Sequence, residues 1–139
     1  MSASLSQRAR ERAAACCEYC QLPEAVAESP FQLDHVIAQQ HGGPTESDNL
    51  AWACFYCNKH KGPNIAGLDP QTGLLTRLFH PRRDAWQEHF LWEGQQLVGK
   101  TPEGRATVVV LAMNRPLVVA RRAALIAEGV FPPHRHGGS

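Results

Sequence analysis

The sequence has no long hydrophobic segment and almost no net charge. Its longest apolar run, TVVVLAM at residues 107–113, falls far short of the roughly 18 residues that a membrane-spanning helix requires. The 14 Lys and Arg residues nearly balance the 13 Asp and Glu residues, which leaves a formal net charge of +1. The sequence therefore predicts no contact with a membrane, and overall charge does not draw the protein to a polyanion.

The N-terminal residues also lack a secretory signal. The first 15 residues, MSASLSQRARERAAA, contain arginines but no apolar stretch behind them. We therefore expect a cytoplasmic protein, whose thiols stay reduced. The apolar fraction of 43% and the charged fraction of 19% across 139 residues are typical of one folded domain rather than of a disordered chain.

Five cysteines stand out against this ordinary composition, and four of them form two pairs with the same spacing. Cys17 and Cys20 enclose Glu-Tyr, while Cys54 and Cys57 enclose Phe-Tyr. In a reducing compartment two CxxC pairs are typical of a structural zinc ion, because together they supply the four thiolates of a tetrahedral site. We predict zinc bound by these four residues, with Cys16 left over. Two chance pairs of buried thiols are the alternative.

Periodicity and turn residues predict a small α+β unit around the cysteine pairs. Side chains alternate along residues 31–37 with the period of a strand, and the sequence of residues 39–49 is rich in turn formers. The other expected elements are a helix at residues 4–16, a strand at 50–53 and a short helix from the second cysteine pair to residue 62.

The C-terminal half predicts a hairpin followed by two helices. Residues 64–73 are expected to form turns, and the segments 90–92 and 96–98 to pair across Glu-Gly-Gln. Proline at a first helical position predicts one helix after Thr101 and another after Asn114, each with that residue as its cap. The last six residues, HRHGGS, are expected to be disordered.

The polar residues between the cysteine pairs occur in a distinctive order. Asp34 and His35 come first, Asn49 follows His35 after fourteen positions, and Asn58 comes directly after Cys57. Together with the cysteine pairs, the segments LDHVIAQQHGG, DNLAWAC and CNKHKG closely resemble the HNH endonuclease family. The resemblance covers residues 17–62 and implies an HNH ββα-metal finger held together by a four-cysteine zinc site.

The resemblance also implies an organisation for the whole chain. Residues 1–139 would form a single HNH nuclease domain, and two segments near residues 78–116 look like the C-terminal extension of a bacterial HNH subgroup. The expected parts are an N-terminal helix (4–16), a zinc-containing core (17–62), an extension with a hairpin and two helices (63–130) and a tail (131–139).

Carried over by position, the resemblance gives each motif residue a role. His35 matches the general base, and Asp34 matches the carboxylate that binds a catalytic Mg²⁺ or Mn²⁺ ion. Asn49 matches the middle asparagine, for which we expect a hydrogen bond that fixes the loop or the imidazole. The third position falls on Asn58, a second metal ligand, which makes the sequence an HNN variant. His60, two residues further on, is the alternative ligand.

These residue types suit the hydrolysis of a phosphodiester bond. A neutral imidazole can take a proton from water, and a hard divalent ion prefers carboxylate and amide oxygens. In isolation, an Asp-His pair is usually a solvated loop pair, and an asparagine after a cysteine is usually a helix cap. Because adjacent strand residues point to opposite faces, Asp34 and His35 can address one phosphate only if the strand is twisted or bulged.

Basic residues outside the motif favour a nucleic-acid partner. Residues 69–139 hold nine basic and six acidic residues. We expect Lys59, Lys61, Arg82 and Arg83 to contact DNA phosphates, although the two arginines are equally compatible with a solvated pair. The sequence thus predicts a metal-dependent DNA endonuclease. The alternatives are a zinc-containing nucleic-acid-binding module with little catalysis, and a redox or zinc-storage protein, which would leave the motif unexplained.

Overall fold

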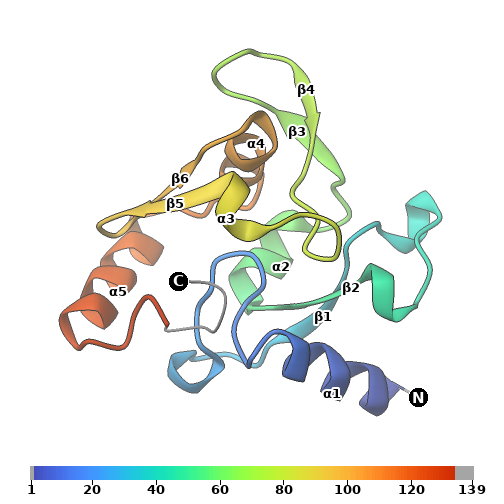
Figure 1. Cartoon of the computed structure of the whole chain (residues 1–139), viewed down its shortest axis with the longest axis horizontal. Coiled ribbons are helices and arrows are strands. Elements are labelled where there is room, and N and C mark those ends of the chain that lie inside the picture. Colours follow the sequence, from blue (N-terminus) through green and yellow to red (C-terminus); the bar gives the residue numbers. More distant parts are fainter. Residues whose placement is uncertain (1, 134–139) are drawn as a thin grey trace.

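The computed structural model describes residues 2–133, which form a mixed helical and hairpin protein (Figure 1). Its helices are α1 (Ser2–Arg12), α2 (Phe55–Lys61), α3 (Trp86–His89), α4 (Pro102–Val110) and α5 (Pro116–Ala127). Its strands are β1 (Gln32–His35), β2 (Leu50–Ala53), β3 (Ala66–Leu68), β4 (Leu75–Arg77), β5 (Phe90–Glu93) and β6 (Gln96–Gly99). The predicted α+β class is confirmed, and within these residues no helix has the length and apolar character to cross a bilayer.

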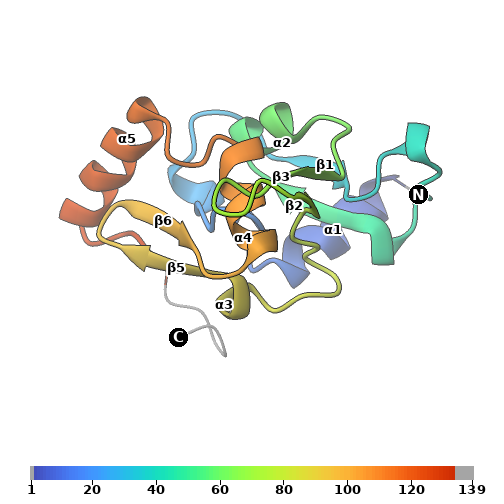
Figure 2. The same ribbon diagram turned by 90° about the horizontal axis from the view of Figure 1, so that it is seen from above.

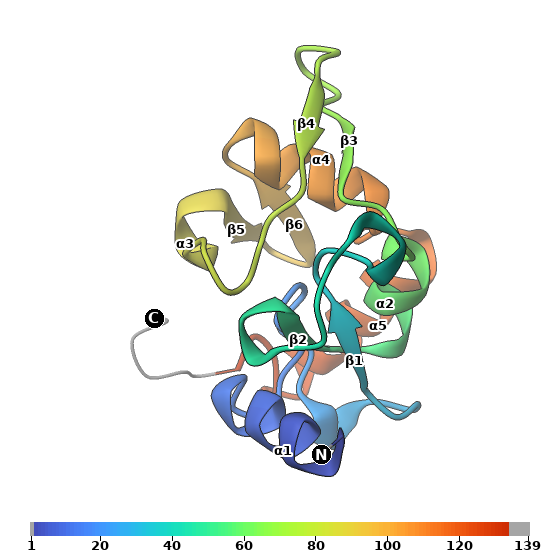
Figure 3. The ribbon, with the colours of Figure 1, turned by 90° about the vertical axis from the view of Figure 1, so that its right-hand side faces the viewer.

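Each strand pairs with its neighbour in sequence, so the strands form three separate antiparallel hairpins. In the first hairpin His35 lies opposite Leu50. Residues 36–49 connect its strands, and α2 follows β2 directly after Cys54, whose side chain caps the helix by accepting a hydrogen bond from the Cys57 amide. These two strands and α2 form a ββα unit, with α2 beside β1 (Figure 3).

In the C-terminal extension α4 packs against the other two hairpins (Figure 2). The Thr101 hydroxyl caps α4, as predicted, by accepting a hydrogen bond of 3.0 Å from the Gly104 amide. Glycine is needed where the first turn of α4 meets the end of α3, because a Cβ on Gly104 would lie 2.1 Å from the His89 carbonyl oxygen. A Cβ on Gly99 would lie 2.4 Å from the Arg105 amide nitrogen.

An aromatic core joins the extension to the first cysteine pair. The ring of Phe79 meets the ring of Tyr19 at a centroid distance of 6.4 Å and that of Phe90 at 5.1 Å. The indole of Trp86 donates a 2.8 Å hydrogen bond to the Tyr19 carbonyl oxygen, and that of Trp92 donates a 3.0 Å bond to Gln21. The three aromatic residues of the segment 86–92 therefore serve in packing.

Three expected elements differ from the structure. The first helix ends at Arg12 rather than near residue 16, because Ala14 and Ala15 adopt left-handed conformations (φ 55° and 56°) that turn the chain into the first cysteine pair. Residues 66–68 and 75–77 form a hairpin, although residues 64–73 were expected to form only turns. Asn114 does not cap the last helix; its side chain bonds the backbone of Leu97 instead. The predicted disordered segment 134–139 lies outside the described residues.

Candidate metal centre and catalytic site

The four cysteines of the two CxxC pairs meet at one buried point. All four sulfur atoms lie within 4.8 Å of one another, and the Cys20 and Cys54 sulfurs are 3.8 Å apart. That distance is about the separation of two thiolates on a tetrahedral zinc ion with Zn–S bonds of roughly 2.3 Å. Hydrogen bonds from the Cys17 and Cys20 thiols hold the pKa of Cys54 far below its usual range. The donor set fits a structural metal ion such as zinc, with no position left for a reacting water.

Asp34 lies in the interior, between β1 and α2. Its two carboxylate oxygens accept hydrogen bonds from the Tyr19 hydroxyl (2.5 Å) and the Lys61 ammonium (3.2 Å). Lys61 also donates to the His35 carbonyl oxygen (3.1 Å). Burial raises the pKa of Asp34, while the Lys61 charge opposes that shift. Tyr19, Asp34 and Lys61 form a buried triad that ties the first cysteine pair to β1 and α2.

Asn58 faces the same side of β1 as Asp34. It lies one turn before Lys61 on α2, and its amide nitrogen donates to the side-chain oxygen of Gln32, two residues before Asp34. In the described part of the chain no donor bonds the Asn58 amide oxygen, which is therefore free for a ligand. Sequence reasoning missed Gln32, although the strand period already placed it on the face of Asp34.

His35 is directed toward the loop between β1 and β2. Its Nε2 atom lies 2.9 Å from the Thr45 hydroxyl oxygen, which also accepts a 3.2 Å hydrogen bond from the Gln39 amide nitrogen. With Nε2 engaged by Thr45, Nδ1 is the ring nitrogen left to accept a proton, provided that the Nε2 atom carries the other. Sequence reasoning missed Thr45, because nothing local marks a hydroxyl ten residues away as a partner of the imidazole.

Asn49 closes that loop through the backbone. Its amide oxygen accepts from the Ile37 amide, and its amide nitrogen donates to the carbonyl oxygens of Ile37 and Pro44, each at 2.9 Å. A Cβ on Gly43 would lie 1.7 Å from the Ile37 oxygen, so only glycine fits there. Asn49 thus holds the loop, and by fixing Pro44 it also sets the position of the next residue, Thr45.

Two of the four expected phosphate contacts must be corrected. Lys61 is 1% exposed and its ammonium group is held inside the triad, so it does not reach a phosphate at the surface. Arg82 is also unavailable, because it pairs with Glu18 and its side chain is only 12% exposed. Lys59 and Arg83, by contrast, are exposed at the surface.

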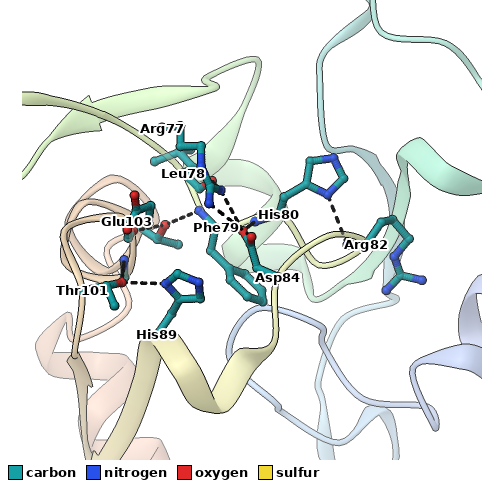
Figure 4. A network of polar contacts seen from close by, with 11 residues as sticks. Arg77, Leu78, Phe79, His80, Arg82, Asp84, His89, Thr101 and Glu103 are labelled. Atoms are coloured by element: carbon teal, nitrogen blue, oxygen red, sulfur yellow. Dashed lines mark hydrogen bonds and ion pairs between the residues drawn. The ribbon is translucent and has the colours of Figure 1, made fainter.

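A cavity of about 290 Å³ opens between the ββα unit and the extension. Arg83 and His80 line it together with residues 36–37 and Lys61. Burial and the Arg83 charge lower the pKa of His80, whose Nδ1 accepts a hydrogen bond from the Arg82 amide. Figure 4 shows this imidazole beside Arg82, with Asp84 bonding the backbone of His80. The charged residues that line the cavity are Lys61, Arg77, Arg83 and Asp84, so cations outnumber the single carboxylate.

His60, the alternative metal ligand, faces away from the triad. Burial and the nearby charges of Arg115 and Lys59 lower its pKa. Its Nε2 atom is buried and has no hydrogen-bond partner among residues 2–133. The structure thus brings Asn58 of α2 to the face of β1 that carries Asp34. His35 points to the loop, and His60 lies near the cations Lys59 and Arg115.

Residues 17–64 match the sequence model of the HNH endonuclease family. The chain therefore contains an HNH domain, and the four cysteines placed to bind a metal ion belong to it. HNH domains act on nucleic acids, so the domain indicates a nuclease or a nucleic-acid-binding function.

Among curated proteins, the chain is similar to the Septu protein PtuA of Bacillus mycoides strain KBAB4, with 30% identity over 94 residues. The aligned region covers 60% of this chain but only 13% of that relative, so the chain corresponds to a small part of a much longer protein. No solved structure matches the chain.

Proposed function

We propose that the protein is a metal-dependent endonuclease that hydrolyses phosphodiester bonds in DNA, with His35 as the general base. The observation that carries the proposal is the hydrogen bond between His35 Nε2 and Thr45, because it orients the ring and leaves Nδ1 to take a proton from water. The HNH domain at residues 17–64 supports the same class of reaction.

A catalytic Mg²⁺ or Mn²⁺ ion would be held by Asp34 and Asn58. Their carboxylate and amide oxygens are ligands that such hard ions prefer, and the two residues share the gap between β1 and α2. Lys61 must give up its 3.2 Å contact with Asp34 for the ion to bind there. The chemistry that such an ion supplies is neutralisation of charge on the phosphate and on the leaving oxygen.

The other residues would bind and orient the substrate. Exposed Lys59 and Arg83 contact backbone phosphates on two sides of the ββα unit, and the cationic cavity beside Arg83 holds the strand near His35. His35 Nδ1 takes the proton of the attacking water while Thr45 retains the proton on Nε2. Reduced thiols at the metal centre suit a cytoplasmic location, which we also propose.

One observation favours a second candidate function, a nucleic-acid-binding module without catalysis. In the structure both Asp34 oxygens already bond protein donors, so the carboxylate is satisfied without a metal ion. A protein that keeps this arrangement when DNA is bound would hold nucleic acid and leave it intact.

The two functions are separated by incubation of the purified protein with supercoiled plasmid and with linear single strands. The reactions contain Mg²⁺, Mn²⁺ or no added divalent ion. We expect cleavage only where a divalent ion is present. Binding without cleavage under every condition would contradict the endonuclease proposal and favour the binding module.

A further inference from the structure

The outer face of α2 carries two exposed aromatic side chains that the proposed mechanism does not use, and a cation lies near each ring. Phe55 and Tyr56 are 37% and 40% exposed, and their rings meet edge to face at 5.4 Å. The Lys59 ammonium lies 5.7 Å from the centroid of the Phe55 ring, and the Arg115 guanidinium lies 5.0 Å from that of Tyr56. We call Phe55, Tyr56, Lys59 and Arg115 the α2 platform.

Two buried nitrogen atoms at this surface have no hydrogen-bond partner among the described residues. They are the Arg115 Nε atom and the His60 Nε2 atom. No carboxylate pairs with Lys59 or Arg115 within the part of the chain described by the structure. An anionic ligand rich in acceptors would complement such a surface.

An open apolar cavity of about 290 Å³ adjoins the platform. Tyr56 of α2 lines it, together with Met113 and Arg115 from the segment before α5 and Leu117 and Val118 from α5 itself. Its walls are mostly apolar, and its charged lining residues are Glu28, Arg115, Arg121 and Arg122, so cations outnumber the single carboxylate. A ligand that fits both features has a flat apolar part and a negatively charged part.

We propose that the α2 platform binds a single-stranded segment of nucleic acid, with an unpaired base stacked on Tyr56 and its flanking phosphates at Lys59 and Arg115. Unpaired bases expose the faces that stack on aromatic rings, whereas a duplex hides them between neighbouring pairs. The inference rests on the proposed function, because Asn58 of the proposed active site lies two residues after Tyr56 on the same helix. It specifies the substrate as nucleic acid with unpaired bases.

The test measures binding of one labelled oligonucleotide, single-stranded or annealed to its complement, to the full zinc-loaded chain without other divalent ions. Affinity is followed across a series of salt concentrations. Tyr56→Leu should weaken single-strand binding about tenfold at every salt concentration and leave the salt dependence unchanged, because it removes a stacking surface and no charge. Tyr56→Phe should bind like the wild type, since the ring remains.

Two further variants separate charge from apolar contact. Arg115→Gln should reduce the slope of log affinity against log salt by roughly 0.7, the value for one phosphate contact on a single strand. Leu75→Ala, at an apolar residue of β4 that is 76% exposed and lies outside the platform and its cavity, should change neither affinity nor slope. Zinc content and thermal melting of each variant confirm that the fold is retained.

Three results would overturn the inference. The first is wild-type protein that binds the duplex at least as tightly as the single strand. The second is a Tyr56→Leu protein that binds the strand like the wild type, which is expected if the surface binds a protein partner. The third is a Leu75→Ala protein that loses as much affinity as Tyr56→Leu. Plasmid cleavage by the same preparations tests the proposed function separately. Cleavage with unchanged binding by Tyr56→Leu contradicts the platform alone, whereas stacking-dependent binding without cleavage supports the platform and contradicts the endonuclease.

Discussion

The residues of the HNN motif are held by different kinds of partner. Asn49 bonds only backbone atoms of its loop, while His35 is oriented by a hydroxyl that no motif contains. The motif types and their order were visible in the sequence, because ligand and base chemistry restricts them to few side chains. The partners Thr45 and Gln32 could not be identified from the sequence. The course of the β1–β2 loop brings Thr45 to His35, and the position of α2 brings Asn58 to Gln32, and both depend on long-range contacts.

Removal of the Thr45 hydroxyl should leave the His35 imidazole in place but without the hydrogen bond that orients it. We expect Thr45→Val to lower the cleavage rate about tenfold, because one hydrogen bond that orients the imidazole is lost. Loss of a general base typically costs more, roughly a hundredfold to ten-thousandfold. Single-turnover rates on plasmid at saturating protein measure the effect.

The matched controls for this variant are Thr45→Ser, which keeps the hydroxyl, and Thr76→Val, which makes the same change on β4. Both should cleave like the wild type. Nitrogen NMR of the imidazole provides a readout that is independent of cleavage: Thr45→Val should lose the single Nε2–H form of the ring. A Thr45→Val protein with wild-type rate and spectrum would show that Thr45 does not orient His35.

At the scale of elements, local signals predicted some units and failed for others. The hairpin at residues 90–99 and the start of α4 follow from turn and cap residues that lie within the elements themselves. The hairpin of β3 and β4 does not, because its turn depends on Asp69, which bonds Thr72 and pairs with Arg105 from α4 at 2.8 Å. A contact between residues 36 positions apart leaves no periodic trace in the sequence.

The contact between α2 and β1 should depend on Lys61. Lys61→Met leaves the Asp34 carboxylate buried without its ion-pair partner, and breaking such a pair costs roughly 3–5 kcal/mol in the free energy of unfolding. Lys59→Met removes an exposed lysine from the same helix and should change that free energy by about 0.5 kcal/mol or less. Urea unfolding of both variants checks the difference. Equal stability of the two would contradict the placement of Lys61 in the triad.

At the scale of the whole molecule, the extension and the HNH domain are built around the first cysteine pair. Trp86 bonds the Tyr19 backbone, Trp92 bonds Gln21, and Arg82 pairs with Glu18. The extension and the HNH domain could each be predicted from the sequence. Nothing in the sequence indicated that the extension packs on residues 18–21. The metal centre therefore supports the whole fold as well as the ββα unit.

Loss of the metal ion should unfold the structure beyond the ββα unit. We expect one zinc ion per chain in protein purified without chelator, and we expect Cys54→Ser to melt well below the wild type, because the fold depends on the four thiolates. Cys16→Ser, a change at the cysteine outside the cluster, is the matched control. Elemental analysis without zinc, or equal melting of the two variants, would contradict the assignment of the cluster.

The most direct test of the account is the plasmid-cleavage rate of His35→Ala in Mg²⁺ or Mn²⁺, compared with the wild type. The variant should lose most cleavage, by roughly a hundredfold or more, while zinc content, melting temperature and DNA affinity stay close to those of the wild type. The substitution removes one proton acceptor and no cysteine ligand. A His35→Ala protein that cuts plasmid at the wild-type rate would contradict the proposed mechanism.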